Sequence, residues 1–132
     1  LRIYEMTDSA ARIAVCQAYL DGLVAGDLDA VLNLFADDAT VEDPVGTEPK
    51  VGQEALAAFY QIACDFVTAA QLTGTPRIAG NEVAFPFEIT TGTDENASVI
   101  SIIDAFRFNN EGKIVSMRAW WGGDNVRPAR AP

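Results

Sequence analysis

One aspartate in the sequence stands in a row of apolar side chains. The stretch SVISIIDAFRFN, residues 98–109, alternates like a strand, and its even positions place Ile102, Asp104 and Phe106 on one face. Arg107 has the opposite parity, so it cannot neutralise Asp104 on that face. An ionised carboxylate in such a row would lose its hydration without a compensating cation.

The carboxyl group of Asp104 has more than one physical solution. A dry pocket can keep it protonated at pH 7 by raising its pKa from about 3.9 to above 7, a bias of roughly 4 kcal/mol against the charged form. Alternatively, a lysine or arginine from elsewhere in the chain pairs with it, or the strand frays or bulges there. A neutral carboxylic acid is a strong hydrogen-bond donor, which suits it to hold an oxyanion.

Three further side chains could take part in acid–base chemistry. Asp43, in TVEDP, shares a strand face with Val41 and could be a general base at the mouth of an apolar cavity, or the Asp-Pro pair could only form a turn. Tyr19 and Tyr60 lie in helical segments, where tyrosines are usually core residues that bond a nearby polar atom. The sequence has no histidine, which excludes Ser-His-Asp and Cys-His nucleophiles and histidine ligands for zinc.

The composition is that of one soluble globular domain. The 132 residues are 49% hydrophobic and 21% charged, and no apolar run approaches the roughly 20 residues that span a bilayer. The net charge of −10 argues against nucleic acid and anionic membranes as partners. Cys16 and Cys64 are expected to be small buried hydrophobic residues, and charges near the N-terminus predict a cytoplasmic protein without a signal peptide.

Helical periodicity dominates the first half of the chain. We expect helices over residues 7–25, 28–35 and 53–68, with Gly26 ending the first. Between the second and third, ADDATVEDPVG changes to the period of a strand, which Pro44 and Gly46 close. Residues 1–6 are expected to be a disordered start or extra upstream sequence, and residues 126–132 a tail.

The second half reads as four strands, over residues 71–79, 82–91, 98–109 and 113–122. Alternation predicts two more apolar rows, which are Val83, Phe85, Phe87 and Ile89, and Val115, Met117, Ala119 and Trp121. Helices followed by an antiparallel meander predict an α+β fold, in which three helices cover one face of a strongly curved sheet. The opposite face carries apolar residues that predict a homodimer, namely Val99, Ile103, Ala105 and Trp120.

Three stretches of the chain resemble one enzyme family. GDLDAVLNLFADDATVEDPVGTEP, GQEALAAFY and IDAFRFNNEGKIVSMRAWW are similar to the bacterial Δ5-3-ketosteroid isomerases in order and spacing, from about residue 8 to residue 125. The resemblance implies a single domain over residues 1–132 with the cone-shaped, mainly antiparallel α+β fold of nuclear transport factor 2, usually as a homodimer. It also implies that Asp43 is the catalytic base, that Tyr19 and Asp104 donate to the oxyanion, and that Tyr60 bonds to Tyr19. It places five side chains against the substrate: Val45, Phe59, Phe87, Met117 and Trp121.

The implied reaction converts a 3-oxo-Δ5-steroid into its Δ4 isomer through a dienolate, without a cofactor or a metal. In that family, an apolar site keeps the second carboxylic acid neutral, so that it can donate a hydrogen bond. Phe35 stands where some members have a third tyrosine. Two alternatives remain open: a protein that binds steroids or other apolar ligands without turnover, and another enzyme of the same fold, such as an epoxide hydrolase with an Asp-Arg-Asp constellation.

Overall fold

Helices and strands alternate little along the chain, and most of the strands follow the helices. A computed structural model describes residues 3–129. The helices are α1 (Ile3–Ala25), α2 (Leu28–Leu32) and α3 (Gln53–Phe66), and two 3₁₀ turns are η1 (Asp94–Asn96) and η2 (Gly123–Asn125). The strands are β1 (Phe35–Glu42), β2 (Lys50–Val51), β3 (Val67–Leu72), β4 (Arg77–Ala79), β5 (Glu82–Thr91), β6 (Ser98–Phe108), β7 (Ile114–Trp120) and β8 (Val126–Pro128).

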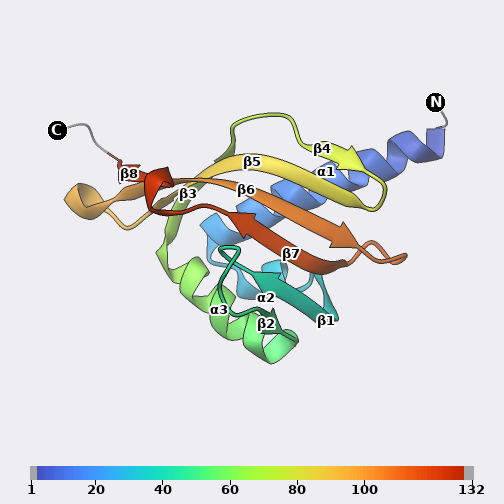
Figure 1. Ribbon diagram of the computed structural model, residues 1–132, viewed down its shortest axis with the longest axis horizontal. Coiled ribbons are helices and arrows are strands. Elements are labelled where there is room, and N and C mark those ends of the chain that lie inside the picture. Colours follow the sequence, from blue (N-terminus) through green and yellow to red (C-terminus); the bar gives the residue numbers. More distant parts are fainter. Residues whose placement is uncertain (1–2, 130–132) are drawn as a thin grey trace.

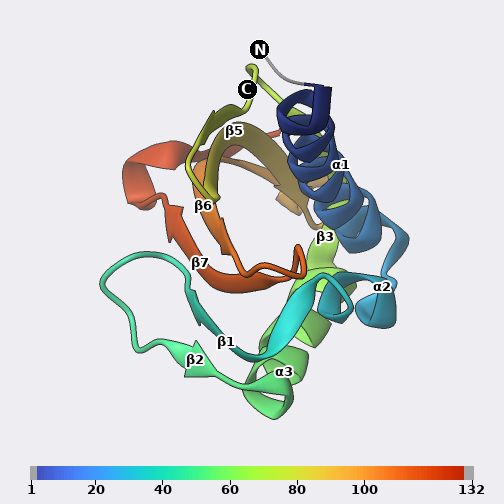
Figure 2. The same ribbon diagram turned by 90° about the vertical axis from the view of Figure 1, so that its right-hand side faces the viewer.

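The strands form a single mixed sheet in the order β2-β1-β7-β6-β5-β3, with β4 also on β5 and β8 also on β6. Strands β1 and β7 run parallel, and the other pairs are antiparallel. The sheet is strongly curved and the helices gather on one side of it (Figures 1 and 2). The predicted α+β architecture, with three helices on a curved and mainly antiparallel sheet, is confirmed.

The long β5–β6 ladder carries the core. Ten residues of β5 pair in unbroken register with β6, and Phe85 lies directly opposite Asp104. Directly paired residues point to the same face, so the buried Phe85 and Phe87 and the buried Ile102 and Phe106 form neighbouring rows toward the helices. The apolar rows predicted for these two strands are therefore present.

Several predicted boundaries were wrong at the helix ends. Helix α1 begins at Ile3, so of the expected irregular start only residues 1–2 lie outside the described part of the chain. Helix α2 ends at Leu32, because the chain then has to extend for Phe35 to pair with Ile114 of β7. Helix α3 ends at Phe66, and the chain passes directly into β3.

The strands differ from the prediction in three places. The strand expected over residues 71–79 is divided into β3 and β4. A register shift at the start of β7 makes Ile114 fully buried and leaves Val115 half-buried, so Val115 was wrongly assigned to the apolar row. The first residues of the expected tail form β8, which pairs with β6. The last residues of the tail, 130–132, lie outside the described part of the chain.

Candidate active site

Asp104 is buried without a counter-charge. It lies in the middle of β6 with 1% of its surface exposed, and neither carboxyl oxygen has a hydrogen-bond partner among residues 3–129. The two ion pairs found in that range, Arg118–Glu42 and Arg127–Glu88, are both elsewhere. A hidden cation is thus contradicted, and the unbroken register of β6 with β5 contradicts a bulge at Asp104.

The electrostatics of this position favour the protonated acid. Burial raises the pKa of Asp104 well above its ordinary value, and the negative charge of Asp43 raises it further. A neutral carboxyl group has one O–H to donate, and in the described structure that donor has no acceptor. Asp104 is therefore equipped to donate a hydrogen bond to a ligand atom.

Two tyrosines from different helices meet beside it. The hydroxyl oxygens of Tyr19, on α1, and Tyr60, on α3, lie 3.0 Å apart, and both residues are buried. Burial raises the pKa of both phenols well above the ordinary value. If the Tyr60 hydroxyl donates to Tyr19, the proton of Tyr19 is free to be donated to a ligand.

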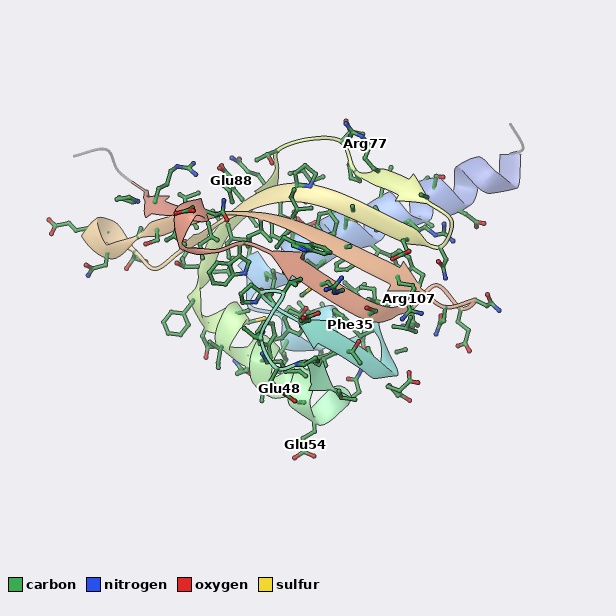
Figure 3. The ribbon with its side chains drawn as sticks, viewed as in Figure 1. Phe35, Glu48, Glu54, Arg77, Glu88 and Arg107 are labelled. Carbon is green, nitrogen blue, oxygen red and sulfur yellow. The ribbon has the colours of Figure 1, made fainter. Side chains whose placement is uncertain are left out.

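Aromatic packing fixes the orientation of Tyr19. Its ring makes edge contacts with Phe106, at 5.1 Å between centroids, and with Tyr60, at 5.8 Å. Phe35, labelled in Figure 3, lies 5.4 Å from the Tyr60 ring. Phenylalanine carries no hydroxyl group, so Phe35 packs against the tyrosine pair without extending its hydrogen bonding.

Asp43 approaches the same region from the end of β1. Its neighbour Glu42 points outward, where it accepts hydrogen bonds from Arg118 at 2.9 Å and from the backbone N–H of Gly46 at 3.0 Å. The half-buried Asp43 instead accepts a 2.7 Å hydrogen bond from the indole N–H of Trp121. Parallel pairing of β1 with β7 brings these two residues together, because each follows the C-terminal end of its strand.

Opposing influences set the protonation of Asp43. Burial raises its pKa, while the hydrogen bond from Trp121 and the positive charge of Lys50 lower it. Lys50 pairs with Val41 across β1 and β2, and its Nζ atom lies 5.0 Å from the ring centroid of Phe59. An ammonium group thus lies near the end of the cavity that holds the Asp43 carboxyl group.

These groups surround a cavity in two adjoining parts. The inner part, of about 50 Å³, is lined by polar groups of Tyr19, Tyr60, Asp43 and Asp104 and by apolar side chains. The outer part, of about 280 Å³, is mostly apolar. The two parts share Asp43, Phe59, Ala63, Val67, Ile89 and Ile102. Together they reach the lower end of the usual range for ligand pockets, roughly 300–1,000 Å³.

Other hollows in the molecule are larger but chemically less suited. One of about 400 Å³ lies between α1 and the β6–β7 turn, one of about 600 Å³ lies over the outer face of the sheet, and one of about 530 Å³ lies between β1 and the end of β6. None of the three is lined by a buried polar atom that lacks a partner. We therefore place the candidate site in the cavity that contains Asp104.

The structure brings together most of the residues expected at the site. Tyr19, Asp43, Tyr60, Phe59, Phe87, Asp104 and Trp121 all line one or both parts of the cavity. Met117 does not: it is fully buried and paired with Phe106, whose ring makes edge contacts with other aromatic rings of the core. Val45 also lines neither part: it lies in the loop after β1, where its N–H donates to the Ala119 carbonyl at 2.8 Å.

Several lining residues were not expected. They are Leu23, Ile62, Ala63, Phe66, Val67, Ile89, Thr91, Ile100 and Ile102. The periodicities contained a signal for some of them. Ile100 and Ile102 share the parity of Asp104, and Ile62 and Phe66 follow Phe59 at helical spacings of three and seven.

Membrane-spanning helices and clusters of metal ligands are both absent from residues 3–129. No helix there is long and apolar enough to cross a membrane. No cluster of three or more His, Cys, Asp or Glu side chains that could hold a metal ion was found over the same range. Cys16 and Cys64 are free and buried, as expected.

The hydrogen bond from Trp121 should control the titration of Asp43. In Trp121→Phe the ionised carboxylate loses a donor, so we expect the pKa of Asp43 to rise, as followed by carbon-13 NMR of the carboxyl group. Trp120→Phe is the matched control, because Trp120 is exposed and its ring lies under Arg118 instead. An unchanged pKa in Trp121→Phe, or an equal rise in both variants, would contradict this assignment.

Comparison with known proteins identifies the family. Residues 16–117 match the SnoaL-like domain. A Steroid Delta-isomerase of Nocardioides simplex is 37% identical over 119 residues, which cover 89% of this chain and 96% of that protein. Epoxide hydrolase LasB of Streptomyces lasalocidi is 33% identical over 123 residues, but this chain spans only 43% of LasB.

A solved structure agrees with the sequence comparisons. It is that of the epoxide hydrolase/cyclase-like enzyme SalBIII, described with a role in pyran ring formation in polyether salinomycin, with a TM-score of 0.84 and 28% identity. The match covers 92% of this chain and 98% of SalBIII. The chain is thus similar to enzymes with two different reactions. It belongs to the SnoaL-like domain family and has the nuclear transport factor 2-like fold.

Proposed function

We propose that this protein is a steroid Delta-isomerase, which moves the double bond of a 3-oxo-Δ5-steroid into conjugation with its carbonyl group. The observation that carries the proposal is the Asp104 carboxyl group, buried and without a partner in the described structure, next to Tyr19 and across a cavity from Asp43. The relative from Nocardioides simplex, similar over nearly its whole length, supports the same reaction.

The proposed reaction needs one base and one oxyanion site. The steroid C3 oxygen accepts hydrogen bonds from Tyr19 and Asp104 at the inner end of the cavity. Asp43 takes a proton from C4, and the electron pair moves into a dienolate whose negative charge rests on the C3 oxygen. The same carboxyl group then returns the proton to C6, which restores the ketone and leaves the double bond conjugated.

The apolar walls contribute to the rate in this scheme. Hydrogen bonds to a developing charge are stronger in a cavity that excludes water, because the local dielectric constant is low. Tyr60 orients Tyr19, and Trp121 holds Asp43 in place and favours its ionised form. In this scheme Tyr19 and Asp43 are each held by one other side chain, and Asp104 is kept neutral by burial.

A second candidate reaction is the opening of an epoxide. A neutral acid and an ionisable base that line one cavity could protonate the epoxide oxygen and activate a hydroxyl group, and two similar proteins are named for such chemistry. Against it, no arginine lines either part of the cavity within residues 3–129, whereas the expected constellation needs one. Arg107 lies exposed near the end of β6 (Figure 3).

A spectrophotometric assay tests the proposal directly. Incubation with 5-androstene-3,17-dione should produce the absorbance of the conjugated enone. Binding of the steroid without this absorbance change would favour a binding protein. Turnover of an epoxide substrate without isomerisation would favour the second reaction.

Asp43→Asn should remove the base without filling or emptying the site. We expect the variant to fold and bind steroid but to lose at least about 100-fold in kcat, since general base catalysis typically contributes 10²–10⁴-fold. Asp37→Asn is the matched control, because Asp37 is an exposed carboxylate of β1, the strand that Asp43 follows. Turnover of Asp43→Asn within tenfold of the wild type would mean that another group is the base.

Variants of Asp104 separate a neutral donor from a charged structural group. Asp104→Ala loses the donor and should raise the barrier by about 2.7–4 kcal/mol, whereas Asp104→Asn keeps a donor and should lose less. Epoxide opening would instead require proton transfer from this position, so both variants would be equally impaired. Measurement of kcat for both reactions compares these outcomes.

The stability of the same variants provides an independent test. Because the folded-state pKa is raised, the folded protein retains a proton that the unfolded chain loses, and the wild-type free energy of unfolding falls as pH rises from the ordinary aspartate range toward that pKa. Asp104→Asn should lack this slope. Destabilisation of both variants by about 3–5 kcal/mol in urea, with normal turnover, would contradict a neutral acid.

We also propose a homodimer across the outer face of the sheet. Ile103 and Trp120, 50% and 42% exposed, are direct neighbours across β6 and β7. Sedimentation at micromolar concentration should therefore give twice the mass of 14.1 kDa, and Ile103→Lys should reduce it to the monomer. Val51→Lys, at an equally apolar but separate surface position, should leave the dimer intact. A wild-type protein that is only monomeric would count against the proposal.

A further inference from the structure

The mouth of the cavity has a composition that bears on the kind of ligand it takes. We propose that the outer cavity selects substrates whose end remote from the reacting carbonyl carries an apolar chain, and that Ile62 and Phe66 of α3 set this preference. The inference rests on the proposed isomerase function for the chemistry at the inner end. It concerns the opposite end of the same cavity.

Two large apolar side chains at the mouth of the cavity are exposed, at positions where a polar side chain would remain in contact with water. Ile62 and Phe66 are 61% and 58% exposed, although both line the outer cavity. They lie four residues apart on α3, one helical turn, and so present adjacent surfaces on the same side of the helix. Single exposed hydrophobic residues are common, but here two converge with Ile100 on one opening.

The outer cavity offers little to a polar group on the ligand. Its polar lining side chains are Asp43, Trp121 and Thr91. The first two are hydrogen-bonded to each other, and Asp43 also lines the inner part. Only the Thr91 hydroxyl is left near the mouth, and no lysine, arginine or amide side chain of residues 3–129 lines this part. A distal carbonyl would lose water there and gain at most one hydrogen bond.

The lengths of α3 and β6 give the distance from the hydrogen-bond donors Tyr19 and Asp104 to the mouth of the cavity. From Tyr60 to Phe66 the helix rises about 9 Å, at about 1.5 Å per residue. From Asp104 to Ile100 the strand covers about 13 Å, at about 3.3 Å per residue. The fused rings of a steroid, from the C3 oxygen to C17, are of comparable length. Ile62, Phe66 and Ile100 would therefore flank the C17 substituent.

An apolar substituent at C17 would gain binding free energy at this position, whereas a ketone there would not. A branched alkyl chain that leaves the rings at C17 would cover the exposed faces of Ile62 and Phe66 and be covered by them. The gain scales with the apolar area removed from water on both partners. Ile62 and Phe66 would thus act on substrate affinity, far from the proton transfer.

Two substrates with the same reacting end test the inference. The ratio of kcat/KM for 5-cholesten-3-one to that for 5-androstene-3,17-dione is measured in one cyclodextrin buffer. We expect the ratio to exceed one in the wild type and to fall about tenfold in Phe66→Ser, mainly through KM, which corresponds to the loss of part of one buried apolar contact. Ile62→Ser should lower the ratio less, and Phe66→Leu should restore most of it.

A control variant shows whether the change in the kcat/KM ratio is specific to the mouth of the cavity. Val51→Ser, at a 62% exposed valine of β2 that lines neither part of the cavity, should leave the ratio unchanged. A wild-type ratio below one, or an equal ratio in wild type and Phe66→Ser, would overturn the inference.

Binding of the two product enones, followed by tryptophan fluorescence, does not depend on turnover. If neither steroid is isomerised but the wild type binds 4-cholesten-3-one more tightly than 4-androstene-3,17-dione, and Phe66→Ser removes that preference, the proposed reaction fails and the specificity of the mouth stands. If both steroids are isomerised without preference, the proposed reaction stands and the specificity fails.

Discussion

Burial of the Asp104 carboxyl group without a counter-charge is the constraint on which the rest of the site depends. The β5–β6 ladder surrounds it with Phe85 and other apolar neighbours, so the charged form has no compensation and burial raises the pKa of Asp104 well above its ordinary value. In most proteins such a group would be paired or replaced by an apolar one. Here the cost of keeping it is consistent with a role that only a ligand can satisfy.

The negative charge of Asp43 affects the pKa of the second carboxyl group of the cavity, Asp104. An ionised Asp43 raises the pKa of Asp104, so the presence of the base helps to keep the acid neutral. Burial also raises the pKa of Asp43 above its ordinary value, but the indole N–H of Trp121 and the charge of Lys50 reduce that rise. The pKa of Asp104 is raised further because its side chain lies in a closed strand interior, whereas Asp43 lies at a half-buried strand end.

The position of Asp104 could be predicted from sequence because β6 is long and continuously paired with β5, so parity holds along its whole length. The same reasoning failed for Val115, where the register shifts near the start of β7. For Met117 parity gave the buried face correctly, but only the family resemblance implied a place against the substrate, since parity gives the face of a sheet and not the depth along a strand. Ile62 and Phe66 were missed because their helical spacing from Phe59 places them on one side of α3 but does not show that this side borders a cavity.

The outward turn of Glu42 has a consequence for how the chain can vary. Glu42, the last residue of β1, and Asp43, which follows it, point to opposite faces of the sheet. A slip of β1 by one residue would therefore put Glu42 in the cavity in place of Asp43. Arg118 and the N–H of Gly46 hold Glu42 on the outside. Such an exposed ion pair adds little to the free energy of folding. Its value would lie in fixing strand register, so an insertion in β1 should be far less tolerated than one in the loop over residues 47–49.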